Sequence, residues 1–75
     1  MTRNEVTELI VLQKQLKKLS WPQLAKAVGQ SKEWTTAALL GQMTLTEEQA
    51  CSVGLLLDLP AAAIAQLQVV PYKGS

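Results

Sequence analysis

The segment Trp34-Thr35-Thr36-Ala37-Ala38-Leu39-Leu40-Gly41-Gln42 determines how the rest of this sequence is interpreted. It has the features of the second helix of a helix-turn-helix pair, with the first helix running from Trp21 to Gly29. Ser31 is suited to cap the second helix, because its side-chain oxygen accepts a hydrogen bond from a backbone N–H of the first turn. Gly41 readily adopts the left-handed conformation that closes a helix. We therefore expect a short helix that begins after Ser31 and ends at Gly41.

The side chains of this second helix argue against sequence-specific DNA binding. Helical spacing predicts an inward face made of Trp34, Ala37, Ala38 and either Leu40 or Gly41. The remaining side chains are Lys32, Glu33, Thr35, Thr36 and Leu39. A recognition helix needs forked donors and acceptors, such as Arg for guanine or Asn and Gln for adenine. This helix offers a lysine beside a glutamate, two threonines and a leucine. Gln30 and Gln42 could make isolated base contacts, but no basic residue beside them would hold the register on phosphates.

Composition and charge indicate one small globular domain. The chain has 75 residues, of which 48% are hydrophobic and 17% are charged, and its net charge is +1. Such a small net charge gives little attraction for a phosphate backbone. No uninterrupted apolar run approaches the ~18 residues that a membrane helix needs, and the N-terminus lacks the pattern of a secretory signal. We therefore expect a cytoplasmic protein that binds no membrane and for which DNA is an unfavoured partner.

The set of chemically active residues is too small for most catalytic sites. The sequence has no histidine, one aspartate, one arginine and one cysteine, Cys51. This set excludes Ser-His-Asp and Cys-His triads and leaves no zinc ligand set. Glu47 and Glu48 point about 100° apart on a helix, so they cannot flank one substrate and instead complement the helix N-terminus. We therefore predict no catalytic residue, no metal site and no cofactor.

Capping signals and apolar spacing predict three more helices. The first runs from about Arg3 to Lys18, another begins after the Thr46 cap and continues through Leu57, and the last has Pro60 in its first turn and runs to Leu67. Capping boxes are predicted at Ser20–Gln23 and Thr46–Gln49. The expected buried stripes are Val6, Leu9, Ile10, Gln13 and Leu16; Leu24, Ala25 and Val28; and Ala50, Val53, Leu56 and Leu57. Gly54, inside a helix, suggests the close approach of another helix.

The last seven residues differ from the helical part. Val70 precedes Pro71 and is therefore extended, and no helical period continues beyond it. Val69, Val70 and Tyr72 are apolar, which makes them candidates for contact with another domain or subunit. The sequence thus predicts an all-α fold, a compact five-helix bundle of the lambda-repressor-like type with a helix-turn-helix core, over residues 1–68. Residues 69–75 are expected to form an extended connector.

The segment Thr35–Gln42 closely resembles part of the N-terminal domain of cyanase (cyanate hydratase, or cyanate lyase). The resemblance extends to both sides and covers nearly all of the chain, but only about half of a complete family member. It includes Leu19-Ser20-Trp21, Leu24-Ala25, Gly29, Val53-Gly54, Leu57-Asp58-Leu59 and the segment from Leu67 to Gly74.

The resemblance implies a bicarbonate-dependent conversion of cyanate, through carbamate, to ammonia and carbon dioxide. Bicarbonate is a second substrate in that family, and no cofactor is implied. The family assembles as a decamer built from dimers, and an arginine, a glutamate and a serine of its C-terminal domain line active sites at subunit interfaces. No residue here matches that catalytic motif, so Arg3, Glu47, Glu48 and Ser75 are not assigned to it. We therefore expect this chain to be inactive alone and to belong to a homo-oligomer.

Two other interpretations fit the predicted fold. One is a stand-alone helix-turn-helix regulator that binds DNA, and the other is a helical protein-interaction module without an enzyme.

Overall fold

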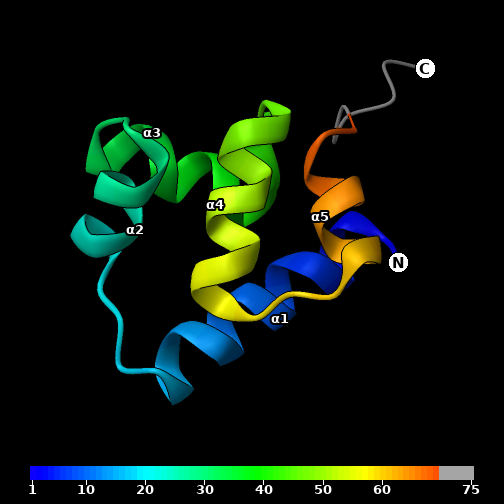
Figure 1. Cartoon of the computed structure of the whole chain (residues 1–75), viewed down its shortest axis with the longest axis horizontal. Coiled ribbons are helices and arrows are strands. Elements are labelled where there is room, and N and C mark those ends of the chain that lie inside the picture. The colour runs from blue at the N-terminus through cyan, green and yellow to red at the C-terminus, as the bar shows by residue number, and fades with distance from the viewer. Residues whose placement is uncertain (70–75) are drawn as a thin grey trace.

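The computed structural model describes residues 1–69 (Figure 1). This part of the chain contains five α-helices and one π-helical turn. The α-helices are α1 (Arg3–Leu16), α2 (Trp21–Val28), α3 (Lys32–Ala37), α4 (Glu47–Leu57) and α5 (Ala61–Leu67). The π-helical turn, η1 (Ala38–Gln42), continues directly from α3. Those 69 residues contain no strand, so the predicted all-α fold is confirmed.

Side-chain caps begin the helices where the sequence indicates. Ser31 Oγ accepts from Trp34 N at 3.0 Å, and capping boxes form between Ser20 and Gln23 and between Thr46 and Gln49. A further capping box, at Thr2 and Glu5, begins α1. Gly29 and Gly41 have φ values of 82° and 105°, the left-handed region that glycine enters without strain. These local signals therefore fix where α2 and the helix after it begin and end.

Helix α4 lies at the centre of the fold, between the α2–α3 pair and α5 (Figure 1). Helix α2 packs against both α3 and α4, whereas α1 contacts η1, α4 and α5. Leu45 N donates to Leu67 O at 2.9 Å and joins the loop before α4 to the end of α5. The core collects apolar side chains from α1, α2, η1, α4, α5 and the loops before and after α4: Val6, Ile10, Leu24, Val28, Ala38, Leu39, Leu45, Ala50, Val53, Leu57, Leu59, Ala63 and Leu67.

The predicted inward face of α3 and η1 was wrong by about one residue. Thr35 and Leu39 are fully buried, whereas Leu40 is 43% exposed and Trp34 is only half-buried. The buried stripe is Thr35, Ala38 and Leu39, which follows i, i+3, i+4 spacing like the predicted one. The helical spacing was therefore predicted correctly, but contacts with α1 and α2 set the rotation of the helix.

The predicted stripe of α1 holds except at its C-terminal end. Val6 and Ile10 are fully buried and Leu9 and Gln13 are half-buried, but Leu16 is 66% exposed. Gln13 already meets Leu57, the last residue of α4, because its Nε2 donates to Leu57 O at 2.8 Å. The last turn of α1 therefore extends past the helix that covers the preceding turns.

The expectation that Gly54 allows the close approach of another helix is confirmed, and it gives a testable prediction. A Cβ at position 54 would lie 2.5 Å from Ile64 Cγ1 on α5 and closer still to Cδ1. We expect Gly54→Ala to destabilise the domain by about 1–2 kcal/mol, because overpacking exceeds the gain of about 1 kcal/mol in helix propensity. In an Ile64→Ala background the same substitution should stabilise. Urea unfolding of the four variants measures both values, and a destabilisation that persists in that background would contradict this contact.

The capping box of α1 predicts a pH dependence. Thr2 N donates to Glu5 Oε1 at 2.7 Å, and this backbone hydrogen bond, with the one from the Thr2 side chain, lowers the pKa of the Glu5 carboxyl. A lowered pKa in the folded state means that the stabilisation is present above the unfolded pKa and is lost as pH falls through the folded value. Thermal unfolding from about pH 6 to pH 3 should therefore show the advantage of the wild type over Glu5→Gln shrinking on acidification. A constant difference would exclude this role.

Candidate functional site

The helix-turn-helix pair keeps its threonine hydroxyls from the surface that would contact DNA. Thr35 lies on the inner side of α3 and is fully buried. Thr36 Oγ1 donates to Lys32 O at 2.7 Å within its own helix. The exposed side chains of α3 are Lys32 and Glu33, neither of which forms a bidentate contact with a base pair as Arg, Asn or Gln does. The exposed Gln30 and Gln42 lie before α3 and at the end of η1. The local geometry therefore agrees with the sequence argument against base recognition.

Both tryptophans serve the core. Trp21 and Trp34 are half-buried and pack against the buried cluster. Lys14 Nζ lies 5.0 Å from the centre of the Trp21 ring, a cation–π distance that connects the C-terminal part of α1 to the start of α2. These aromatic rings are therefore not free platforms for stacking a base.

Arg3 is the residue whose role the sequence argument missed. It is the first residue of α1, yet its side chain is almost fully buried. Its guanidinium donates to Ala38 O, to Met43 O at 3.0 Å and to Gln66 O at 3.5 Å. These three carbonyls come from the start of η1, the residue after η1 and the end of α5. Arg3 therefore joins the N-terminus of the chain to η1 and to the end of α5.

The electrostatic setting of Arg3 also separates it from a substrate-binding arginine. Burial lowers the pKa of the Arg3 guanidinium, because desolvation disfavours its charged form. A cation at a helix N-terminus opposes the helix dipole, so an arginine at this position was the signal available in the sequence. All of its observed partners are backbone carbonyls of the same chain, which makes it a structural clamp.

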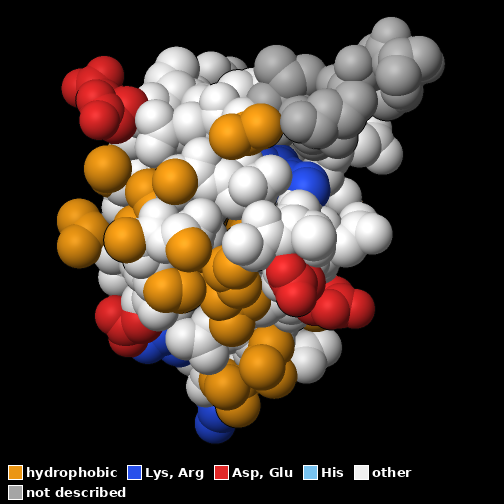
Figure 2. Space-filling view, turned by 90° about the vertical axis from the view of Figure 1, so that its right-hand side faces the viewer, with side chains coloured by type: hydrophobic (Ala, Val, Ile, Leu, Met, Phe, Trp, Pro, Cys, Tyr) orange, Lys and Arg blue, Asp and Glu red, His pale blue; other side chains and the backbone are white. Residues whose placement is uncertain are grey.

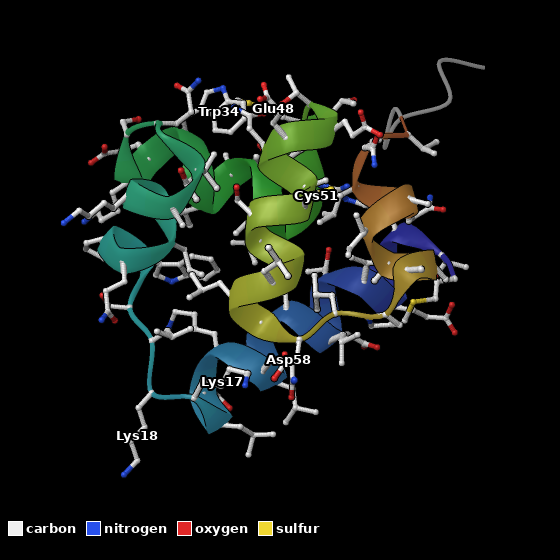
Figure 3. The ribbon with its side chains drawn as sticks, viewed as in Figure 1. Lys17, Lys18, Trp34, Glu48, Cys51 and Asp58 are labelled. Carbon is white, nitrogen blue, oxygen red and sulfur yellow. The ribbon has the colours of Figure 1, made fainter. Side chains whose placement is uncertain are left out.

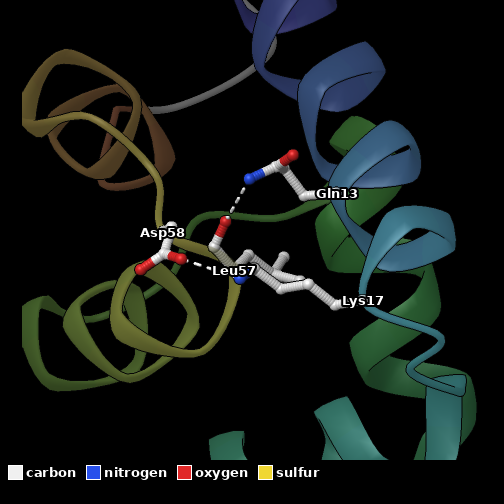
Figure 4. Close-up of polar contacts among 4 residues, drawn as sticks. All are labelled: Gln13, Lys17, Leu57 and Asp58. Carbon is white, nitrogen blue, oxygen red and sulfur yellow. Dashed lines mark hydrogen bonds and ion pairs between the residues drawn. The ribbon is translucent and has the colours of Figure 1, made fainter.

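A second polar connection lies where α1 meets the end of α4 (Figure 4). Lys17 Nζ lies 2.7 Å from Asp58 Oδ2, beside the hydrogen bond from Gln13 to Leu57 O. Asp58 closes α4 in the left-handed conformation, with φ 54°. Because both charged side chains are solvent-accessible, the ion pair is worth only about 0–1 kcal/mol. This connection positions helices and offers no reactive group.

The structure brings no catalytic or metal-binding group together within residues 1–69. Over that range there is no pocket and no cluster of three or more His, Cys, Asp or Glu side chains that could hold a metal ion. Glu47 and Glu48 are exposed at the first turn of α4, and Cys51 is exposed on the same helix. The helices of this range are also too short or too polar to cross a membrane.

The predicted interface residues are only partly within the described chain. Val69 is 41% exposed, and its N–H donates to Gln66 O at 3.1 Å beyond the end of α5. Val70 and Tyr72 lie outside the described residues, as does the rest of the predicted connector. Contact of these three residues with another domain or subunit stays a prediction.

The fold and the polar contacts of residues 1–69 define an all-helical domain of five α-helices, in which the one arginine of the sequence holds the fold together. The chain belongs to the family described as "Cyanate hydratase, N-terminal", whose model matches residues 3–71. It is 71% identical to the cyanate hydratases of Dechloromonas aromatica and Ralstonia pickettii and 67% identical to that of Thiobacillus denitrificans. Each alignment covers all of this chain and 51% of the relative, so the chain spans about half the length of these curated relatives. The resemblance drawn from Thr35–Gln42 is confirmed.

Proposed function

We propose that this chain is the N-terminal, assembly-supporting domain of a cyanate hydratase. The observation that carries the proposal is the family match over residues 3–71 of a chain that spans half of its relatives. The complete protein would convert cyanate, with bicarbonate as second substrate, through carbamate to ammonia and carbon dioxide. Residues beyond this domain would supply the catalytic groups, and the active assembly would be a cytoplasmic homo-oligomer, a decamer in its full form.

The chemistry of two anionic substrates supports this division of labour. Cyanate and bicarbonate need cations and hydrogen-bond donors that converge in a pocket from which water is excluded. Arg3 is occupied by three carbonyls, and Lys17 is paired with Asp58. Lys14 lies over Trp21, and Lys18, Lys26 and Lys32 are exposed on separate elements. None of these cations converges with another within residues 1–69.

The isolated chain provides the first test of this proposal. We expect purified chain, supplied with cyanate and bicarbonate, to release no ammonia above the buffer control. The Dechloromonas aromatica cyanate hydratase, at the same molar concentration, serves as the positive control. Turnover by the isolated chain would overturn the proposed division between assembly and catalysis.

The alternative of a DNA-binding regulator is not favoured, because α3 exposes only Lys32 and Glu33 and the net charge of the chain is only +1. Fluorescence anisotropy with a labelled duplex would test it directly. We expect no binding at micromolar chain in low salt, whereas binding that weakens steeply with salt would favour the alternative.

A further inference from the structure

The end of α5 is held by residues that are distant in the sequence. A helix ends with four backbone carbonyls that have no partner inside the helix. In α5 the last two of these carbonyls accept hydrogen bonds from other parts of the chain. Arg3 Nη1 donates to Gln66 O at 3.5 Å, and Leu45 N donates to Leu67 O at 2.9 Å. The end of α5 is therefore tied to the start of α1 and to the loop before α4.

The same arginine also holds the loop before α4. Arg3 Nη2 donates to Met43 O at 3.0 Å and to Ala38 O, so one guanidinium spans η1, this loop and the end of α5. Leu45 lies two residues after Met43 in the loop, and its side chain is buried, as is that of Leu67. These contacts join five residues into one unit. We call this unit the exit clamp and define it as Arg3, Met43, Leu45, Gln66 and Leu67.

Helix α5 has no charged side chain of its own with which to form an ion pair. Figure 2 shows the side of the molecule that carries α5, where charged side chains lie mainly at the margins of an apolar band. Apolar packing holds the helix along its length, since Ala63 and Leu67 are fully buried and Ile64 lies against Gly54. The hydrophobic effect is non-directional. The hydrogen bonds of the exit clamp therefore add the directional constraint on the end of α5.

Stability alone is a poor reason for an arginine at this position. Arg3 is only 9% exposed, and the partners of its guanidinium are neutral carbonyls. Its Nε has no hydrogen-bond partner within residues 1–69. Burial of a charge without an opposite charge is costly. The specific contribution of arginine is geometric, because its planar fork sets the relative positions of several acceptors.

We propose that Arg3 is a positioning residue for the cyanate hydratase reaction. Through the exit clamp it fixes the direction in which the chain leaves α5, and thereby the placement of the catalytic groups in the complete protein. This proposal rests on the function proposed above, in which the N-terminal part matched here is followed by a catalytic half. A misplacement of about 1 Å, caused far from the chemistry, can slow a reaction about a hundredfold.

Backbone dynamics of the isolated chain test the exit clamp without any activity measurement. NMR relaxation should give the amides of Gln66, Leu67 and Gln68 order parameters of about 0.85 in the wild type. In Arg3→Lys they should fall below about 0.6, because lysine lacks the fork that spans the acceptors. Order parameters that stay at the wild-type value in Arg3→Lys would overturn the proposal.

Val28→Ala is the control for a general loss of stability. Val28 belongs to the core on α2, which packs against α3 and α4, so this variant weakens the domain without touching the exit clamp. It should leave the order parameters at the end of α5 unchanged. If Val28→Ala lowered them as much as Arg3→Lys, global destabilisation would explain the effect, and the proposal would be overturned.

Lys17→Ala is the control for the loss of any long-range contact made by a cation. Lys17 lies at the C-terminus of α1 and pairs with Asp58, far from the end of α5 (Figure 3). We expect wild-type order parameters at the end of α5 in this variant. An effect equal to that of Arg3→Lys would again contradict a specific role for Arg3.

Steady-state kinetics test the consequence for the reaction. The enzyme is a chimera in which these 75 residues replace the matching half of the Dechloromonas aromatica cyanate hydratase. Arg3→Lys should lower kcat at least about fivefold while KM for cyanate changes less than about twofold. Val28→Ala and Lys17→Ala should leave both constants within about twofold, and size-exclusion chromatography checks that all variants assemble alike. An Arg3→Lys chimera with unchanged kcat would overturn the proposal.

Failure of this proposal is distinguishable from failure of the proposed function. An unmodified chimera that assembles but releases no ammonia would contradict the function, and the role of Arg3 in the reaction would fall with it. The order parameters do not depend on turnover. Their loss in Arg3→Lys would then locate the failure in the proposed function and not in the exit clamp.

Discussion

Replacing Leu39 with alanine should lower the free energy of unfolding by about 3 kcal/mol. Leu39 is fully buried in η1 and belongs to the central cluster, so truncation removes apolar contacts and leaves a cavity. In a domain of this size, that loss corresponds to a fall in Tm of roughly 12–24 °C. Urea denaturation monitored by circular dichroism measures it directly.

The adjacent leucine provides the matched control. Leu40 is 43% exposed, so Leu40→Ala should cost no more than about 1 kcal/mol. The ratio of the two effects tests the rotation of the helix and not only its existence. Equal costs at both positions would mean that the helix-turn-helix pair packs in a different orientation from the one described.

Replacing Arg3 with alanine should cost a similar amount, about 2–4 kcal/mol. The substitution removes hydrogen bonds from a charged donor to Ala38 O, Met43 O and Gln66 O, and it leaves carbonyls at two helix ends without that partner. Thermal unfolding should show a large fall in Tm, and hydrogen exchange should be accelerated at the ends of η1 and α5 while α2 and α4 are less affected.

Arg3→Lys separates the role of charge from that of geometry. Lysine keeps the positive charge but lacks the planar fork that spans several acceptors. We expect it to recover less than half of the lost stability. Full recovery by lysine would show that a point charge suffices and that the multiple contacts of the guanidinium are unimportant.

Local signals explain why the boundaries of the helices could be predicted. Ser20 with Gln23, Thr46 with Gln49, and the left-handed Gly29 and Gly41 act within a few residues of themselves, so the sequence neighbourhood contains all the required information. Gly54 is similar, because an interior glycine in a helix has few explanations other than close packing.

The features that the sequence did not predict depend on distant contacts. The burial of Thr35 and Leu39, in place of Leu40, is set by how α1 and α2 pack against the helix. The consecutive apolar residues from Ala37 to Leu40 permit two rotations of this helix. The Arg3 clamp joins residues up to 63 positions apart, and Gln13 meets Leu57 across 44 positions. The spacing of Leu16 predicts a core residue, but Leu16 is exposed because α4 ends at Leu57, beside Gln13.

For the candidate functional site, the sequence chiefly excluded classes of catalytic site. A chain without histidine, with one arginine and one aspartate, lacks the residues for common catalytic sites, and the resemblance at Thr35–Gln42 supplied the family.

The central claim is that this domain supports a cyanate hydratase whose catalytic groups lie elsewhere in the complete protein. The most direct test replaces the matching half of the Dechloromonas aromatica cyanate hydratase with these 75 residues and measures ammonia release from cyanate and bicarbonate. We predict a folded, assembled chimera with activity of the same order as the parent enzyme. A chimera that folds and assembles but releases no ammonia would contradict the account.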